Sequence, residues 1–246
     1  VTHATMAAAW TGAFLYMLQI YLDFSAYSDM AIGLGKMTGF VYKENFNYPY
    51  TAKSVTDFWR RWHISLSSFF RDYVYIPLGG NRVGRLRNYF NLLVTFVISG
   101  IWHGANWTFF LWGTLHGFLL CIEKALGIGK QKFTGINKFF HWAITFVLVC
   151  FAWILFRANS LSDAMMVIKG IFTNLGVPKP EYANFIAIGM AMTILLIKEF
   201  ADEYQWPVRV ADSKSWIVRH VYLVMMIAYI ILFGVLGGDQ FIYFQF

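Results

Sequence analysis

Charged side chains are scarce in this sequence: Asp, Glu, Lys and Arg make up 13% of its 246 residues, against about 25% in a typical soluble domain. Hydrophobic residues make up 58%, and aromatic residues alone make up 20%. Several segments approach the roughly 20 apolar residues that a helix needs to cross a bilayer. This composition excludes an ordinary water-soluble domain. It predicts an all-α, polytopic membrane protein in which residues 1–246 form a single membrane domain.

Cysteine is also rare, and its placement argues against a disulfide framework. Cys121 and Cys150 both lie in apolar stretches, and the sequence has no C-x-x-C pair. The N-terminus has neither an initiator Met nor a basic segment typical of a cleavable signal. We therefore expect the chain to be the C-terminal part of a longer one.

The net charge is +7, and the basic residues are confined to short segments between the apolar runs. Membrane topology and anionic lipid headgroups explain that pattern better than nucleic acid does. We therefore expect membrane lipid, and not nucleic acid, as a partner. The segment with Arg82, Arg85 and Arg87 favours cytoplasmic anchoring, although the phosphates of an acyl carrier remain an alternative.

The apolar runs predict membrane helices separated by polar segments. After the first run, Asp23 and Asp29 form a polar stripe with Ser25 and Ser28, for which hydrogen bonds between helices are favoured over substrate contact. Residues 39–50 have the Asn and Pro residues of a loop, and residues 199–214 are polar enough to lie outside the bilayer. Helices are expected at residues 4–22, 139–156, 162–172, 185–197 and 217–236, an apolar run extends over 89–120, and a basic loop is expected at 123–138.

Residues 54–70 predict one amphipathic helix that is too short and too charged to span the membrane. Ser54 and Asp57 resemble a capping box at its start. Trp59 and His63 are four residues apart, which places them on one face. A helix of this kind is typical of the headgroup region.

The most informative stretch is G-I-W-H-G-A-N-W-T-F-F-L-W-G-T-L-H-G, residues 100–117. An imidazole at membrane depth is costly unless it is paired or lines a wet cavity, so His103 and His116 are candidates for function. The glycines around His103 predict irregular backbone facing such a cavity. We therefore expect a multi-helix bundle around an intramembrane chamber, with interfacial and broken helices.

Proton transfer is the chemistry that this stretch favours. Histidine titrates near neutral pH, so His103 is a candidate general base, with packing an equal alternative. His116 is more readily explained as structural. No H-E-x-x-H occurs, and no carboxylate lies within a turn of His103, so we expect no metal site and no bound cofactor. A serine nucleophile is disfavoured because G-x-S-x-G is absent.

Long composite motifs resemble the membrane-bound O-acyltransferase family, in the branch that acetylates alginate. They are F-W-R-R-W-H-I-S-L-S-S-F-F-R-D-Y-V-Y-I-P-L-G-G-N-R, the 100–117 stretch, Y-L-D-F-S-A-Y-S-D-M-A-I-G-L-G and the terminal F-I-Y-F-Q-F. The resemblance implies a chamber through a bacterial cytoplasmic (inner) membrane. An acyl group arrives there from a cytoplasmic thioester donor such as acetyl-CoA. It leaves toward hydroxyls of an extracytoplasmic polysaccharide, often with an extracytoplasmic acyltransferase partner.

The resemblance also implies a catalytic core at residues 54–117. His103 matches the essential histidine of the family, acting as base on the attacking hydroxyl, and His63 matches a second histidine of this branch. Two alternatives stay open: a D-alanyl transfer protein of teichoic acid synthesis, and a transporter or channel subunit without covalent chemistry. Supporting or substrate-binding roles are predicted for Trp59, Arg60, Arg61, Asp72, Asn81, Trp102, Asn106 and His116.

Overall fold

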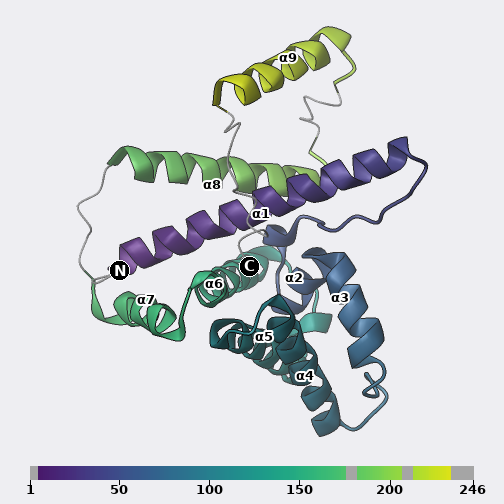
Figure 1. The fold of residues 1–246 in the computed structure, drawn as a ribbon, viewed down its shortest axis with the longest axis vertical. Helices are drawn as coiled ribbons and strands as arrows, with labels where there is room; N and C mark the ends of the chain where they lie inside the picture. Colours follow the sequence, from purple (N-terminus) through teal and green to yellow (C-terminus); the bar gives the residue numbers. More distant parts are fainter. Residues whose placement is uncertain (1–4, 176–181, 207–212, 234–246) are drawn as a thin grey trace.

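The computed structural model describes residues 5–175, 182–206 and 213–233, and the elements of this part are helical (Figure 1), as expected. Short turns lie at η1 (Pro49–Thr51) and η3 (Ile128–Lys130), and η2 (Arg71–Tyr75) is a π-helical segment. The terminal F-I-Y-F-Q-F motif and the end of the expected last helix lie outside the described residues. The longer helices are α1 (Met6–Met37), α2 (Val55–Arg61), α3 (Ile64–Phe70), α4 (Arg85–His103), α5 (Trp107–Ala125), α6 (Gly135–Arg157), α7 (Leu161–Thr173), α8 (Tyr182–Glu203) and α9 (Trp216–Phe233).

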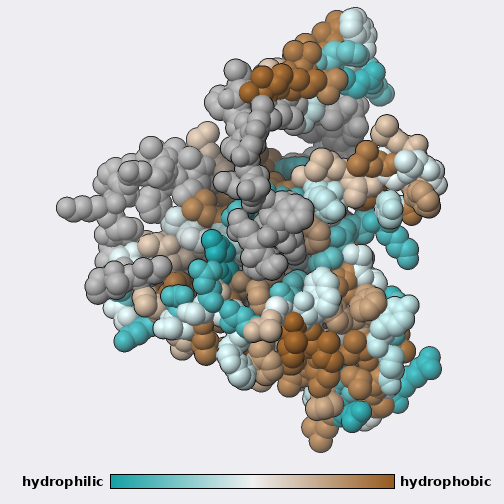
Figure 2. All heavy atoms as spheres, viewed as in Figure 1, coloured by the Kyte–Doolittle hydropathy of each residue, from teal (hydrophilic) through white to brown (hydrophobic). Residues whose placement is uncertain are grey.

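One helix of the described chain, α6, has the length and apolar composition to cross a membrane. The expectation of several spans therefore stays a prediction. Large apolar side chains are nevertheless exposed on many helices, among them Phe90, Trp107, Phe118 and Phe140. Figure 2 shows such side chains gathered over α4 and α5 and along α9. Surface of this kind suits lipid or another protein surface better than water.

Helix α1 is longer than the apolar run that predicted it, because it continues through the polar stripe. Ser28 donates a hydrogen bond to the Phe24 carbonyl one turn earlier (2.9 Å), so its hydroxyl is satisfied inside the helix. Thr5 caps the first turn by accepting from the Ala8 amide (3.2 Å). In Figure 1, α8 runs along one side of α1, and α6 and α7 lie on its other side. The helix therefore forms one wall of the fold.

The prediction of one continuous helix over residues 54–70 is wrong, because the chain breaks between α2 and α3. Trp62 is extended, and His63 adopts a left-handed conformation (φ 45°, ψ 54°). The loop at residues 39–48 docks into this break: the Asn47 amide donates to the Arg61 carbonyl and the Ile64 amide donates to the Asn45 carbonyl, both at 2.9 Å. These tertiary hydrogen bonds replace the helical ones that the amphipathic pattern predicted.

The expected apolar run at 89–120 is a hairpin of α4 and α5, and the predicted backbone break follows His103. The two helices approach closely through glycines. A methyl group added at Gly100 would collide with the Phe109 carbonyl, and one added at Gly113 would collide with the Phe96 carbonyl. Small residues permit this contact, as they do between membrane helices in general.

The predicted basic loop at 123–138 begins later than expected, because α5 continues through Ala125. Glu123 is buried, and its carboxylate accepts hydrogen bonds from the amides of Val55 (2.6 Å) and Thr56 (2.8 Å). A carboxylate at a helix N-terminus satisfies free amides and the helix dipole together. Glu123 therefore fastens the start of α2 to the end of α5.

The glycine contact gives a first prediction. Gly113→Ala places a methyl group against the Phe96 carbonyl, so α4 and α5 must separate. We expect the free energy of unfolding to fall by about 1–3 kcal/mol, measured as a lower thermal midpoint of the protein in detergent. Gly33→Ala on α1 is the matched control, because nothing lies within 4 Å of its added methyl group. Its midpoint should be unchanged or higher; equal midpoints for wild type and Gly113→Ala would contradict the close contact.

Candidate functional site

His103 is the last residue of α4 and lies among aromatic rings. Its ring meets Trp112 edge-on at 5.3 Å and Phe156 at 4.9 Å between centroids. Trp112 comes from α5 and Phe156 from α6, so three helices surround the imidazole. Within the described residues, neither ring nitrogen of His103 has a hydrogen-bond partner. The lone pair is therefore not engaged by the part of the protein that the structure describes.

His63 lies in the break between α2 and α3. Its ring packs edge-on against Phe24 of α1 at 4.7 Å, and its Nδ1 is 3.2 Å from Oδ1 of Asn45. Burial, together with the smaller effect of the nearby His103, lowers the pKa of His63 to about 3. The structure thus brings the two histidines of the motifs within electrostatic reach of one another. It also keeps His63 neutral near physiological pH.

His116 is fully buried one helix turn after Trp112 on α5. Its Nδ1 accepts a hydrogen bond from Nε1 of Trp59 (3.2 Å), and the Trp59 and Trp112 rings pack against it at 5.0 Å. The indole nitrogen can only donate, so Nδ1 of His116 is the unprotonated ring nitrogen. This contact joins α2 to α5 one helix turn from Trp112, which packs on His103.

The adjacent arginines of α2 have different environments. Arg61 forms an ion pair with Glu203 of α8 (2.6 Å) and another with Asp57 (2.8 Å). Burial alone would lower the pKa of Arg61, but its hydrogen bonds to Glu203 and Asp57 raise it above the usual value. Arg60 is exposed and makes no ion pair within the described part of the chain. Arg61 therefore stabilises the fold, whereas the side chain of Arg60 is available to bind a ligand.

The remaining predicted supporting residues are dispersed. Asp72 is exposed and pairs with its neighbour Arg71, and Trp102 is more than half exposed. Asn106 caps α5 by accepting from the Thr108 amide (3.2 Å). Oδ1 of Asn81 accepts from the Tyr75 hydroxyl (2.9 Å) and from Nζ of Lys124 (2.8 Å). Of these four, Trp102 contacts His103, with ring centroids 5.0 Å apart, whereas the contacts of Asp72, Asn81 and Asn106 lie elsewhere.

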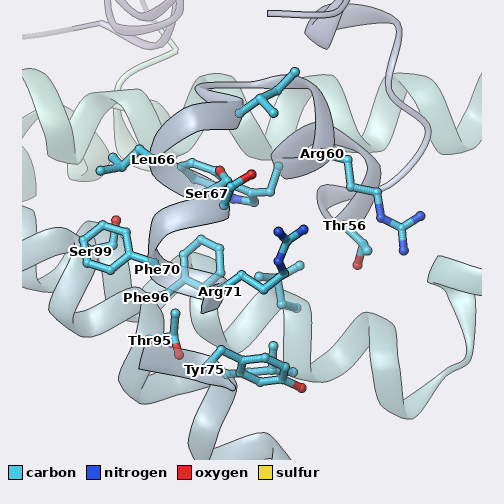
Figure 3. Close-up of a pocket in the computed structure, with 15 residues that line it drawn as sticks. Thr56, Arg60, Leu66, Ser67, Phe70, Arg71, Tyr75, Thr95, Phe96 and Ser99 are labelled. Atoms are coloured by element: carbon cyan, nitrogen blue, oxygen red, sulfur yellow. The ribbon is translucent and has the colours of Figure 1, made fainter. Parts of the chain in front are cut away.

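Two adjoining cavities lie between α2, α3, α4 and α5. The first has a volume of about 490 Å³; Ser99 and Phe70 lie at one end of it and Arg60 and Thr56 at the other (Figure 3). Ser99 is one turn before His103 on the same face of α4. The second, of about 940 Å³, shares Arg60 and is lined by further basic side chains. Its polar lining includes Arg60, Asn81, Arg85, Asn88 and Lys124.

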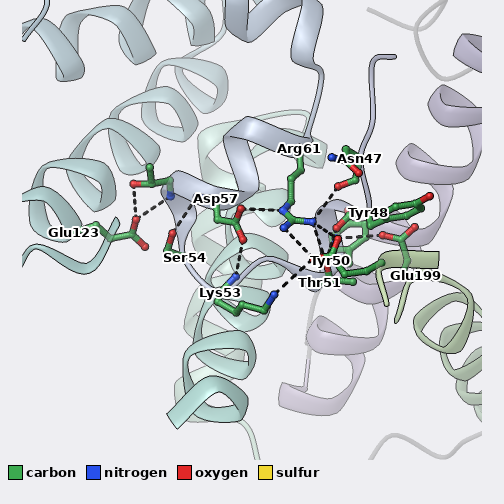
Figure 4. Close-up of polar contacts among 12 residues, drawn as sticks. Asn47, Tyr48, Tyr50, Thr51, Lys53, Ser54, Asp57, Arg61, Glu123 and Glu199 are labelled. Atoms are coloured by element: carbon green, nitrogen blue, oxygen red, sulfur yellow. Dashed lines mark hydrogen bonds and ion pairs between the residues drawn. The ribbon is translucent and has the colours of Figure 1, made fainter. Parts of the chain in front are cut away.

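Several carboxylates that hold these elements were not identified as important from the sequence. Glu199, which was expected outside the bilayer, is fully buried, where it accepts a hydrogen bond from the Tyr21 hydroxyl (2.5 Å). Figure 4 shows Glu199 beside Tyr50. It also shows Glu123, a residue of α5, next to the start of α2. Asn45 was predicted only as a loop residue. Local sequence carries no signal for these contacts, because the partners are far apart in the chain.

No group of three or more His, Cys, Asp or Glu side chains in the described residues is arranged to hold a metal ion. The polar groups of the site are instead two imidazoles and the guanidinium groups near the cavities. Such groups suit proton transfer and the binding of anions.

Residues 1–167 match the model of the membrane-bound O-acyltransferase family. The chain belongs to this family. It is 41% identical to a probable alginate O-acetylase AlgI of Pseudomonas putida, over 98% of this chain and 54% of that protein. It is 36% identical to a peptidoglycan O-acetyltransferase of Helicobacter pylori, over the whole chain and 50% of that protein. A teichoic acid D-alanyltransferase of Bacillus subtilis is 29% identical over 65% of this chain and 43% of its own length.

This membrane-bound O-acyltransferase chain spans about half the length of the curated relatives that it matches along its full extent. The family model covers α1 to α6 and most of α7, and therefore both histidines and both cavities. The match to the two O-acetylation proteins extends over α8 and α9 as well. Helix α8, which carries both Glu199 and Glu203, is thus part of the shared region.

The different surroundings of the two arginines give a second prediction. Arg61→Gln removes the guanidinium that pairs with Asp57 and Glu203 and leaves Glu203 only the ion pair with Lys53 at 3.8 Å, so we expect the free energy of unfolding to fall by about 1.5–3 kcal/mol. Arg60→Gln removes the same charge from the neighbouring position and should leave stability unchanged. Thermal unfolding in detergent measures both. Equal midpoints for the two variants would contradict the structural assignment of Arg61.

Proposed function

We propose that this chain carries the transfer site of a membrane O-acyltransferase. The enzyme moves an acetyl group from a cytoplasmic thioester, acetyl-CoA, to hydroxyls of an extracytoplasmic polysaccharide. The observation that carries the proposal is His103, an imidazole without a hydrogen-bond partner in the described chain, enclosed by the rings of Trp112 and Phe156. The names of two relatives, which refer to O-acetylation of alginate and of peptidoglycan, support the acetyl group and the polymer acceptor.

In this mechanism, His103 acts as the general base. It accepts the proton of the acceptor hydroxyl as the oxygen attacks the thioester carbonyl carbon. A C–O bond forms and the C–S bond breaks, and the leaving sulfur receives the proton from the imidazolium. His63 contributes a second neutral imidazole to the same chamber. General-base catalysis of this kind contributes about 10²–10⁴-fold to the rate.

The two cavities provide an approach for the donor. Arg60 lies where they adjoin, and Arg85 and Lys124 line the second one, so phosphate groups of the donor meet positive charge there. The first cavity is mainly apolar and reaches Ser99, one turn before His103. A donor with its phosphates at Arg60 therefore extends its acyl end toward the turn of α4 that carries the base.

The setting of the reaction is part of the proposal. We assign the protein to a bacterial inner membrane, with the donor side facing the cytoplasm and an extracytoplasmic acyltransferase partner completing transfer to the polymer. The D-alanyltransferase alternative rests on a more distant relative, at 29% identity. The transporter alternative does not account for similarity to proteins named as acyltransferases.

The first experiment compares wild type with His103→Ala, in the complete protein reconstituted in vesicles with radiolabelled acetyl-CoA. We expect release of the acetyl label from CoA to fall at least about 100-fold, because the base is lost. His220→Ala on α9 is the matched control, since this histidine is exposed and bonded to its own helix at Trp216. Equal turnover by wild type and His103→Ala would refute the role of His103. Turnover only with a D-alanyl carrier protein would show that this carrier, and not acetyl-CoA, is the donor.

A second experiment tests the donor path through Arg60. Arg60→Gln should raise KM for acetyl-CoA about 10-fold or more with kcat little changed, because a charged hydrogen bond of about 1.5–3 kcal/mol is lost. Arg87→Gln removes the same charge from α4, at a side chain that lies over Phe90 and outside both cavity linings. Its KM should match wild type. An equal rise in KM for both variants would indicate a general surface-charge effect and not a site at Arg60.

A further inference from the structure

Asn45 holds the break between α2 and α3 with both its backbone and its side chain. Its carbonyl accepts from the Ile64 amide (2.9 Å), and its Oδ1 accepts from the amide (3.1 Å) and the hydroxyl (2.8 Å) of Ser65. These contacts flank His63 on its C-terminal side. His63 itself is in the left-handed region, which costs a residue other than glycine about 1–2 kcal/mol. The contacts of Asn45 therefore hold a strained turn at the site.

The orientation of the Asn45 amide follows from its donors. A backbone N–H can only donate, so the side-chain atom facing the Ser65 amide must be the oxygen. On the other side, Nδ2 of Asn45 donates to Oγ of Ser28 (3.4 Å), and that hydroxyl donates onward to the Phe24 carbonyl. Exchanging the two amide atoms would place NH₂ against N–H. The oxygen is therefore the atom that faces His63.

This orientation also determines which nitrogen of His63 carries the proton. Nδ1 lies 3.2 Å from Oδ1 of Asn45 and 3.3 Å from Oγ of Ser65. The single hydroxyl proton of Ser65 points to Oδ1, its nearer neighbour at 2.8 Å. An unprotonated Nδ1 would then place its lone pair against that of the amide oxygen. Nδ1 must therefore donate, which leaves the lone pair of the ring on Nε2.

We propose that Asn45 is a positioning residue that holds His63 as the Nδ1–H tautomer, with Nε2 as its only proton acceptor. Its importance for acyl transfer rests on the proposed function, whereas the tautomer does not. With Nδ1 engaged, the only acceptor left on the ring of His63 is Nε2. The ring can then accept one hydrogen bond or one proton there, in one orientation.

The surroundings of His63 support a neutral ring. The edge of its imidazole meets the Phe24 ring at 4.7 Å, and burial keeps its pKa well below neutrality. Both features favour the neutral ring over the imidazolium form, which would protonate both nitrogens. The choice lies between two neutral tautomers. The oxygen of Asn45 decides between them.

The test reads the tautomer directly. Complete protein labelled with nitrogen-15 in its histidine rings is placed in lipid vesicles near pH 7. Solid-state NMR then distinguishes protonated from unprotonated ring nitrogens, and the spectrum of His63→Gln identifies the signals of His63. We expect a protonated Nδ1 and an unprotonated Nε2. Either the Nε2–H tautomer or an imidazolium in wild type overturns the proposal, whatever the activity of the protein.

Substitutions at Asn45 extend the test. Asn45→Ala should lose the single tautomer and give a mixture, and Asn45→Asp should keep it because a carboxylate oxygen still accepts from Nδ1. Asn47→Ala is the matched control: Asn47 belongs to the same loop, but the hydrogen bonds that it makes in the structure come from its backbone. Its spectrum should match wild type. An unchanged His63 tautomer in Asn45→Ala also overturns the proposal.

Activity separates this proposal from the function on which it rests. In acetyl-CoA turnover, we expect Asn45→Ala to lower kcat about 10–100-fold, as loss of an outer histidine partner does elsewhere, and Asn45→Asp to recover part of it. A loss of turnover with an unchanged tautomer refutes the positioning role and leaves the acyltransferase assignment intact. The expected tautomer without turnover by any variant, wild type included, refutes the proposed function and leaves the tautomer intact.

Discussion

The close approach of the α4 and α5 backbones is the constraint on which the site depends. Gly100 and Gly113 leave no room for a side chain between the helices, so the end of α4 lies directly against α5. Trp112, next to Gly113, can then pack on His103. One turn later, His116 receives the indole N–H of Trp59 and connects the hairpin to α2. Because Gly100 and Gly113 have no side chains, the two backbones come close enough to place the His103 ring against Trp112.

The break between α2 and α3 complements this hairpin. A continuous helix would satisfy its own amides and carbonyls. At the break, Asn45 instead accepts from the amides of Ile64 and Ser65, and the Asn47 amide donates to the Arg61 carbonyl. The left-handed His63 is held by that loop on one side and by Phe24 on the other. The breaks after Trp62 and after His103 thus each position one histidine, and the two histidines lie within electrostatic reach of one another. Strained backbone is commonly found at functional sites.

Composition and local motifs predicted the helical class, the irregular backbone around His103, and the family, because these follow from residues close together in sequence. They did not predict the break at His63, since the apolar positions of Phe58, Trp62 and Leu66 continue a helical pattern through it. Glu123 and Glu199 were assigned to polar segments by their neighbours. Their partners lie 68 and 178 residues away, beyond any local pattern.

The Tyr21–Glu199 hydrogen bond also bears on how the protein is made. Its partners are 178 residues apart, and the ion pair of Arg61 with Glu203 joins residues 142 apart. At about 5–20 residues per second, a ribosome completes α1 and α2 many seconds before it completes the end of α8. During that time Tyr21 lacks Glu199, and Arg61 has Asp57 but not Glu203. These long-range contacts to α8 therefore form only after most of the chain has been synthesised.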